Sequence, residues 1–250
     1  MLVDLVSSNI FYLVIAGVLI GEYLAEKLYM KILRRGFPSF FEGKAFWRRG
    51  FAGQFLMLSF SLVVMGLLGF REQFGFSLQN FNESVWLVFS LGLPFAALFS
   101  IGAFILMKKD QTGKAPMPSA DWMKNPSDRT GHLVYCFTMN GIGEETFYRG
   151  LIQGYLAMNM AGYVVLGSFS LMYSTVLASV IFVLVHLENV ITKDETMAEY
   201  IFWLPYRTII AFILGITFQL TGSLLAPIVI HNLSNGLLSI AAIQALKDKS

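Results

Sequence analysis

The chain has 250 residues and a formal net charge of +2. Hydrophobic residues make up 56% of it and charged residues only 14%, whereas an average soluble domain is about 25% charged. This small number of charged residues cannot cover a surface that faces water. The composition therefore excludes a soluble enzyme, a disordered protein and a nucleic-acid-binding protein. The single cysteine, Cys136, excludes an internal disulfide and a cysteine-rich zinc site. The sequence therefore predicts an integral membrane protein whose surface contacts the lipid bilayer.

Apolar runs of the length that crosses a bilayer, about 17–25 residues, follow one another along the chain. They are Leu5–Leu24, Phe51–Phe70, Val85–Met107, His132–Leu156, Met160–Leu187, Ile201–Leu220 and Leu224–Leu246. We expect an all-α, polytopic membrane helix bundle with seven or eight transmembrane helices. The number depends on Met160–Leu187, which is long for one helix and short for two. Its glycines are compatible with a short or re-entrant piece before a full helix from about Tyr173.

Lysine and arginine are concentrated in two of the expected loops. Glu26–Gly50 and Lys108–Gly131 together contain twelve of them, whereas Arg71–Ser84 contains one. By the positive-inside rule, the two basic loops are predicted to be cytoplasmic and the N-terminus to be outside. The first loop either forms an amphipathic helix on anionic headgroups or only sets the topology. We expect one membrane domain, with the first helices and basic loops in residues 1–131 and the catalytic helices in residues 132–246.

The fourth apolar run contains three charged residues at membrane depth, Glu144, Glu145 and Arg149. A charge there costs about 2.5–3.5 kcal/mol on insertion scales, so it is a functional hypothesis by default. Glu145 and Arg149 have the spacing and order of a favourable helical ion pair. Glu144 lies about 100° further round the helix and cannot share that arginine in the same geometry. An unpaired carboxylate suits a general base, and a structural clamp made by all three residues is the alternative.

Two later runs add imidazole and amide groups. Phe182 and His186 are four residues apart, and so are His231 and Asn235 in the last run. Taken alone, each histidine is also explained by a hydrogen bond that joins membrane helices. Together with Glu144 they supply a base, two imidazoles and an amide on three helices, in a chain with three histidines. This combination favours a hydrolytic site that activates water.

At this point the motifs resemble a known family. Glu-Glu-x-x-x-Arg, Phe-x-x-x-His and His-x-x-x-Asn, in this order on successive helices, are similar to the CPBP family, also called the Abi family. These are CaaX proteases and bacteriocin-processing proteins, and they include the type II CaaX prenyl endopeptidases. The resemblance covers Gly141 to Gly236 and implies a helical intramembrane peptidase whose catalytic cavity lies in the membrane and opens to the cytosol.

The resemblance also implies what each motif residue does. Glu144 would activate the water with the help of His186. His231 and Asn235 would stabilise the tetrahedral oxyanion, and the Glu145–Arg149 pair would shape the site. Zinc is an open alternative, because Glu144, His186 and His231 have the donor types of a catalytic zinc site with a free fourth position. We favour hydrolysis without a metal.

Other polar residues have simpler interpretations. Cys136 is interpreted as a small packing residue rather than a nucleophile, and His132 as an ordinary histidine at a membrane boundary. Arg207 has two interpretations. It either binds the C-terminal carboxylate of a substrate by bidentate pairing, or extends its charged end to the cytosolic interface.

Three functions are compatible with these features. The first is an intramembrane endopeptidase that cuts a short tail from a membrane-associated protein, and removal of the C-terminal tripeptide of prenylated CaaX proteins is one form of it. The second is a non-enzymatic immunity or scaffold protein in which the motif residues stabilise the bundle. The third is a proton-coupled transporter with Glu144 and His186 as a relay, which the lack of a visible inverted repeat disfavours.

Overall fold

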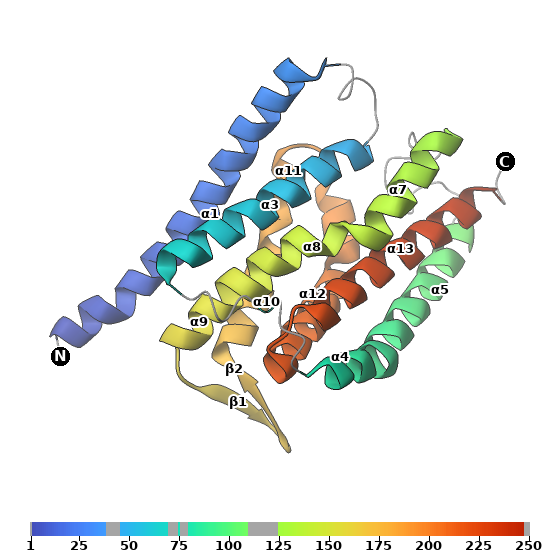
Figure 1. The fold of residues 1–250 in the computed structure, drawn as a ribbon. Coiled ribbons are helices and arrows are strands. Elements are labelled where there is room, and N and C mark those ends of the chain that lie inside the picture. Colours follow the sequence, from blue (N-terminus) through green and yellow to red (C-terminus); the bar gives the residue numbers. More distant parts are fainter. Residues whose placement is uncertain (1, 39–45, 70–74, 76–79, 110–124, 248–250) are drawn as a thin grey trace.

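The fold is taken from a computed structural model, which describes residues 2–38, 46–69, 75, 80–109 and 125–247. Long helices pack side by side in a bundle (Figure 1). Within the described residues, five helices are long and apolar enough to cross a membrane. They are Trp47–Leu68, Phe81–Lys109, Tyr173–Ile191, Met197–Thr221 and Leu225–Ala245. The predicted helical membrane bundle is therefore confirmed.

The described residues of the N-terminal part include three long helical segments. They are α1 (Leu2–Gly36), α3 (Phe46–Leu68) and a continuous rod of α4 (Phe81–Leu87), the π-helix η2 (Val88–Gly92) and α5 (Leu93–Lys109). The sequence allowed an amphipathic helix on the membrane surface in Glu26–Gly50. This prediction is wrong for residues 26–36, because they continue α1. No glycine or proline interrupts the chain between Glu22 and Arg35, so nothing ends the helix before Gly36. Residues 39–45 lie outside the described part.

A second rod carries the glutamates. It consists of α7 (Pro126–Thr138), α8 (Asn140–Glu145), the π-helix η3 (Thr146–Gln153) and α9 (Gly154–Asn159). The Asn125 side chain accepts a hydrogen bond from the backbone N–H of Ser127 at 3.0 Å, and Pro126 occupies the first helical position. This N-terminal cap starts the rod at Pro126, so the second basic loop ends before the expected Gly131. The π-helix begins directly after Glu145, and π-turns occur frequently at functional sites.

The long apolar run Met160–Leu187 is divided between a hairpin and a helix. Strands β1 (Tyr163–Leu166) and β2 (Phe169–Met172) pair antiparallel, and α10 (Tyr173–Val185) follows at once. The helix start at Tyr173 is confirmed. The piece before it is a β-hairpin, so the all-α expectation needs this correction. Gly167, with φ 64°, supplies the left-handed residue of the two-residue turn, and β-branched and aromatic residues fill the strands.

The last helices are α11 (Leu187–Ile191), α12 (Met197–Thr221) and α13 (Leu225–Lys247). Thr196 and Glu199 form a capping box at the start of α12, and Gly222, with φ 63°, ends it. α13 runs along α5 and also contacts α7, α8 and α12 (Figure 1). The C-terminal helix is thus surrounded by elements from both parts of the chain.

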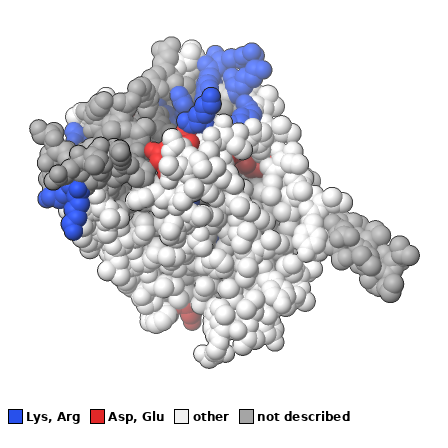
Figure 2. Space-filling model, turned by 180° about the vertical axis from the view of Figure 1, so that it is seen from behind, with Lys and Arg blue, Asp and Glu red and all other residues white. Residues whose placement is uncertain are grey.

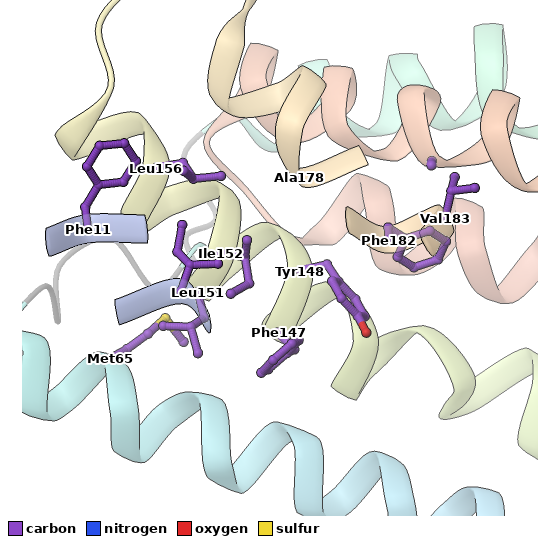
Figure 3. Close-up of a cluster of buried hydrophobic side chains, with 12 residues drawn as sticks. Phe11, Met65, Phe147, Tyr148, Leu151, Ile152, Leu156, Ala178, Phe182 and Val183 are labelled. Atoms are coloured by element: carbon purple, nitrogen blue, oxygen red, sulfur yellow. The ribbon is translucent and has the colours of Figure 1, made fainter. Parts of the chain in front are cut away.

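One hydrophobic cluster joins α1, α3, η3, α9, α10 and α12 (Figure 3). Its fully buried members include Met65 of α3, Phe147 of η3 and Leu156 of α9. The charged side chains are distributed quite differently. Figure 2 shows the lysines and arginines gathered at one end of the molecule, while most of the remaining face carries no charge. An uncharged belt below a basic end is the surface that a bilayer with anionic headgroups accommodates.

Candidate active site

A cavity of about 500 Å³ lies between the helices of the second half, α1 and α3. Its wall contains five of the seven site residues expected from the sequence, namely Glu144, His186, Arg207, His231 and Asn235. The other two, Glu145 and Arg149, are fully buried behind it. The structure therefore gathers the three motifs around one cavity. The wall also includes acidic residues of α1 and α11, which are Glu22, Glu26 and Glu188.

Two glycines just before the glutamates allow α8 to approach two neighbouring helices closely. A Cβ atom on Gly141 would lie 2.9 Å from Cβ of His231 on α13. A Cβ atom on Gly143 would lie 2.4 Å from the backbone oxygen of Gln54 on α3. Only glycine leaves room for both contacts, so α8 is held between α3 and α13. The backbone N–H of Gly141 also donates to Oδ1 of Asn232 at 2.7 Å, which fixes α13 against α8 beside His231.

The predicted ion pair between Glu145 and Arg149 is present. Arg149 Nε donates to Glu145 Oε2 at 3.1 Å, and both side chains are 0% exposed. The other carboxylate oxygen, Oε1, lies 2.7 Å from His231 Nδ1. Glu145 therefore holds the arginine on its own helix and orients the imidazole of α13. A carboxylate on one ring nitrogen of a histidine sets which nitrogen faces the reacting groups.

Glu144 faces a different environment from its neighbour. Its Oε1 accepts a hydrogen bond from Gln54 Nε2 at 2.8 Å, and its backbone N–H donates to Gln54 Oε1 at 3.0 Å. Its Oε2 lies 3.8 Å from His231 Nε2, and the side chain is 20% exposed. His231 thus stands between the two glutamates, with one ring nitrogen toward each. The sequence expectation that Glu144 has no partner holds for its own helix, but α3 and α13 supply two.

His186 ends α10 on the same cavity wall. Its Nδ1 lies 2.7 Å from the backbone oxygen of Phe182. Since a carbonyl only accepts, Nδ1 carries the proton and Nε2 is the acceptor nitrogen in the neutral ring. The Phe182 ring is close to both imidazoles, with its centroid 5.0 Å from that of His186 and 6.1 Å from that of His231. The Phe-x-x-x-His motif therefore packs its aromatic residue against both histidines. Phe182 also packs edge-on against Tyr148, and both side chains are drawn in Figure 3.

Asn235 and Arg207 also line the cavity. Tyr206 donates its hydroxyl to Asn235 Oδ1 at 3.5 Å, which leaves the Asn235 NH₂ group as a donor. Arg207 Nη2 contacts both carboxylate oxygens of Glu195 at 2.9 Å. Both side chains of this pair are largely buried in the protein. Arg207 Nη1 is buried and has no hydrogen-bond partner within the described part of the chain.

The alternative zinc set does not fit this arrangement. Among the described residues, no three histidine, cysteine, aspartate or glutamate side chains are close enough together to hold a metal ion. The Nδ1 atoms of His186 and His231 bond Phe182 and Glu145, respectively, and this leaves the Nε2 atom of each ring free. We therefore derive no step through a metal.

Sequence reasoning missed several residues that shape the site. Gln54 contacts Glu144, Asn232 anchors α13, and Glu195 binds Arg207. Each lies far along the chain from its partner or outside the three motifs. The glycines of Gly-Ile-Gly-Glu-Glu were the available signal, because they mark a helix that two others approach closely.

Cys136 and His132 are also closer to the cavity than expected. Cys136 Sγ lies 3.4 Å from His132 Nε2, which in turn lies 3.1 Å from Ser239 Oγ on α13. All three side chains line the cavity wall. The His132 side chain is buried and faces α13 rather than the outer surface of the bundle.

Comparison with known proteins gives one match. Residues 126–237 match the family model described as type II CAAX prenyl endopeptidase Rce1-like. We call this stretch, which is less than half of the chain, the Rce1-like segment. The resemblance inferred from the three motifs is thereby confirmed, and all seven expected site residues lie inside the Rce1-like segment. The match supports an intramembrane protease of the CAAX type with a protein or peptide substrate in the membrane. No curated protein and no solved structure matches the chain.

Proposed function

We propose that the chain is an intramembrane endopeptidase in which Glu144 activates a water molecule without a metal. The observation that carries this proposal is the 3.8 Å separation of Glu144 Oε2 and His231 Nε2 on the cavity wall. A water molecule hydrogen-bonded to both atoms fits this separation, since each bond is about 2.8 Å long. The carboxylate then accepts a proton while the water oxygen attacks the peptide carbonyl.

The other polar groups complete the reaction. His186, with Nε2 as its acceptor nitrogen, assists Glu144 in removing protons from the water. The Asn235 NH₂ group and His231 stabilise the oxyanion that forms on the carbonyl. Glu144 finally returns the proton to the leaving amine, which balances the hydrolysis. Glu145 and Arg149 do not touch the substrate, and they shape the site by holding His231.

Arg207 is proposed to bind the C-terminal carboxylate of the substrate. It lines the same cavity, and its Nη1 is not used by Glu195 or by any other described residue. A carboxylate at Nη1 would set a fixed distance between the chain end and the attacked bond. Such an enzyme removes a short peptide from the C-terminus of its substrate. The family description favours the C-terminal tripeptide of a prenylated CaaX protein as this peptide.

We further propose seven spans in one membrane unit formed by residues 1–250. The five apolar helices account for five spans. Two more are α1 and the rod from α7 to α9, because each has the length of a span. An odd number places the two chain ends on opposite sides. With the basic segments in the cytosol, the N-terminus is outside, and the cavity, which reaches Glu188 and Asn189 next to α12, opens to the cytosol.

The test uses purified protein in detergent and a quenched fluorogenic farnesylated CaaX peptide. We expect the wild type to hydrolyse the peptide and Glu144→Ala to be inactive, with a normal folded yield. Exhaustive chelation should leave the rate unchanged, and a loss of activity that only zinc restores would overturn the metal-independent mechanism. If the wild type cleaves neither this peptide nor an unprenylated membrane peptide, the enzyme hypothesis fails and a scaffold function replaces it.

A further inference from the structure

Gln54 on α3 makes a paired contact with Glu144 that the mechanism above does not use. The Gln54 amide accepts from the Glu144 backbone N–H at 3.0 Å and donates to Glu144 Oε1 at 2.8 Å. The orientation of the amide follows from chemistry, because only its oxygen can accept from an N–H and only its NH₂ group can donate to a carboxylate. The same residue therefore binds Glu144 at the backbone and at the side chain.

We propose that Gln54 is a positioning residue that fixes the Glu144 carboxylate for catalysis. This inference rests on the proposed function, since it takes Glu144 as the base. Gln54 lies behind the glutamate, outside the cavity wall, and is 6% exposed. By occupying Oε1 it leaves Oε2 as the oxygen available to water, and Oε2 is the atom that lies 3.8 Å from His231 Nε2.

Packing keeps the Gln54 amide in place. Gly143 brings α8 so close to α3 that an added Cβ atom would lie 2.7 Å from Gln54 Oε1 and 2.4 Å from its backbone oxygen. The hydrogen bond from the Gln54 NH₂ group to Glu144 Oε1 also favours the ionised form of Glu144, because a charged acceptor forms the stronger bond. A free glutamate side chain has several rotatable bonds, and a catalytic group displaced by about 1 Å can lose about 100-fold in rate.

Gln54 lies outside residues 126–237, the segment that matches the Rce1-like family. The carboxylate of the proposed base is thus held by a residue of the N-terminal part. We infer that the family segment requires α3 for full turnover, and that α3 is more than a membrane anchor.

The experiment compares Gln54→Met with Gln153→Met. Methionine has a similar length but cannot form either hydrogen bond. Gln153 is a matched control, because it is 2% exposed and donates to Thr175 and to Gly215 on other helices without lining the cavity. We expect Gln54→Met to lower kcat about tenfold or more with KM unchanged, and Gln153→Met to lower the melting temperature with kcat unchanged.

A second readout does not depend on hydrolysis. Gln54→Met and Gln153→Met are each combined with Glu144→Ala, and melting temperatures are measured in detergent. The shifts should be non-additive by about 2–4 °C for Gln54 and additive for Gln153. Additive shifts at Gln54, or a Gln54→Met enzyme with wild-type kcat, would overturn the inference. If the wild type hydrolyses nothing, the proposed function fails, and the melting temperatures still decide whether Gln54 holds Glu144.

Discussion

Glu144 and Glu145 are adjacent in the chain but have opposite surroundings. Glu145 is fully buried between Arg149 and His231, so Glu145→Gln leaves a guanidinium charge without its carboxylate. Breaking a buried pair costs about 3–5 kcal/mol, and we expect a lower melting temperature and yield together with lower activity. Glu144→Gln keeps an oxygen that can accept from Gln54, so its melting temperature should be unchanged or higher while hydrolysis is abolished. Melting curves and one peptidase assay decide the matter.

Equal destabilisation by the two substitutions, or residual hydrolysis by Glu144→Gln, would show that the base is assigned to the wrong residue. The control is Glu83→Gln, which changes a glutamate at the start of α4, away from the cavity. This variant should behave as the wild type in both measurements.

Arg207 gives a second prediction at the same scale. If its free Nη1 binds the substrate carboxylate, the wild type should prefer a peptide with a free C-terminal acid to the same peptide with a C-terminal amide. Arg207→Lys retains a charge for Glu195 but loses the forked donor geometry. We expect this variant to raise KM about tenfold for the acid and to leave KM for the amide unchanged. A wild type with the same KM for both peptides would refute the assignment.

Local spacing predicted the Glu145–Arg149 pair, because residues four apart on a helix are neighbours whatever surrounds them. It could not predict that His231 joins the two glutamates or that Gln54 binds Glu144. These partners are 86 and 90 residues away along the chain, so only the packing of helices brings them together. The motif order indicated which residues meet but not which atoms face each other.

At the scale of helices, the contact between α3 and α8 depends on one missing side chain. Gly143→Ala would place a Cβ atom 2.4 Å from the Gln54 backbone oxygen, so the two helices must move apart. We expect this variant to have a lower melting temperature and a kcat that is about tenfold lower or more, because the Gln54–Glu144 contact lengthens. Gly53→Ala is the control, since its Cβ atom would meet nothing within 4 Å.

Gly53→Ala should be neutral or slightly stabilising, because alanine favours a helix over glycine by roughly 0.5–1 kcal/mol. The measurements are melting temperature and initial rate for both variants. Wild-type kcat in Gly143→Ala would mean that the close approach of α3 does not position the base.

Element boundaries were predictable where the sequence carries explicit signals. The start of α10 at Tyr173 follows a stretch with Gly162 and Gly167, and the extent of the bundle follows from its apolar runs. The π-helix η3 and the β-hairpin before α10 were not predicted. An apolar run at membrane depth has the same composition in a helix or a hairpin, and a π-turn leaves no change in residue type.

For the whole molecule, the two parts of the chain complement each other. The Rce1-like segment supplies Glu144, the histidines and Asn235, whereas α1 supplies acidic residues of the cavity wall and α3 supplies Gln54. α5 runs along α13, the helix that holds His231 and Asn235 (Figure 1). The N-terminal helices therefore support the site from behind and cover one side of it, which is the reason to treat the chain as one unit.

The orientation of this unit in the membrane is the last prediction. Seven spans with the basic end in the cytosol put the turn of the β-hairpin on the outside, since α9 ends and α10 begins at the opposite end from Arg35 and Lys109. In a Cys136→Ala background, single cysteines are introduced at Ser168 and at Lys109. A membrane-impermeant maleimide applied to intact cells should label Ser168→Cys only, and both positions should react after the membrane is permeabilised. Labelling of Lys109→Cys in intact cells would invert the topology and open the cavity to the outside, which would exclude a cytosolic substrate.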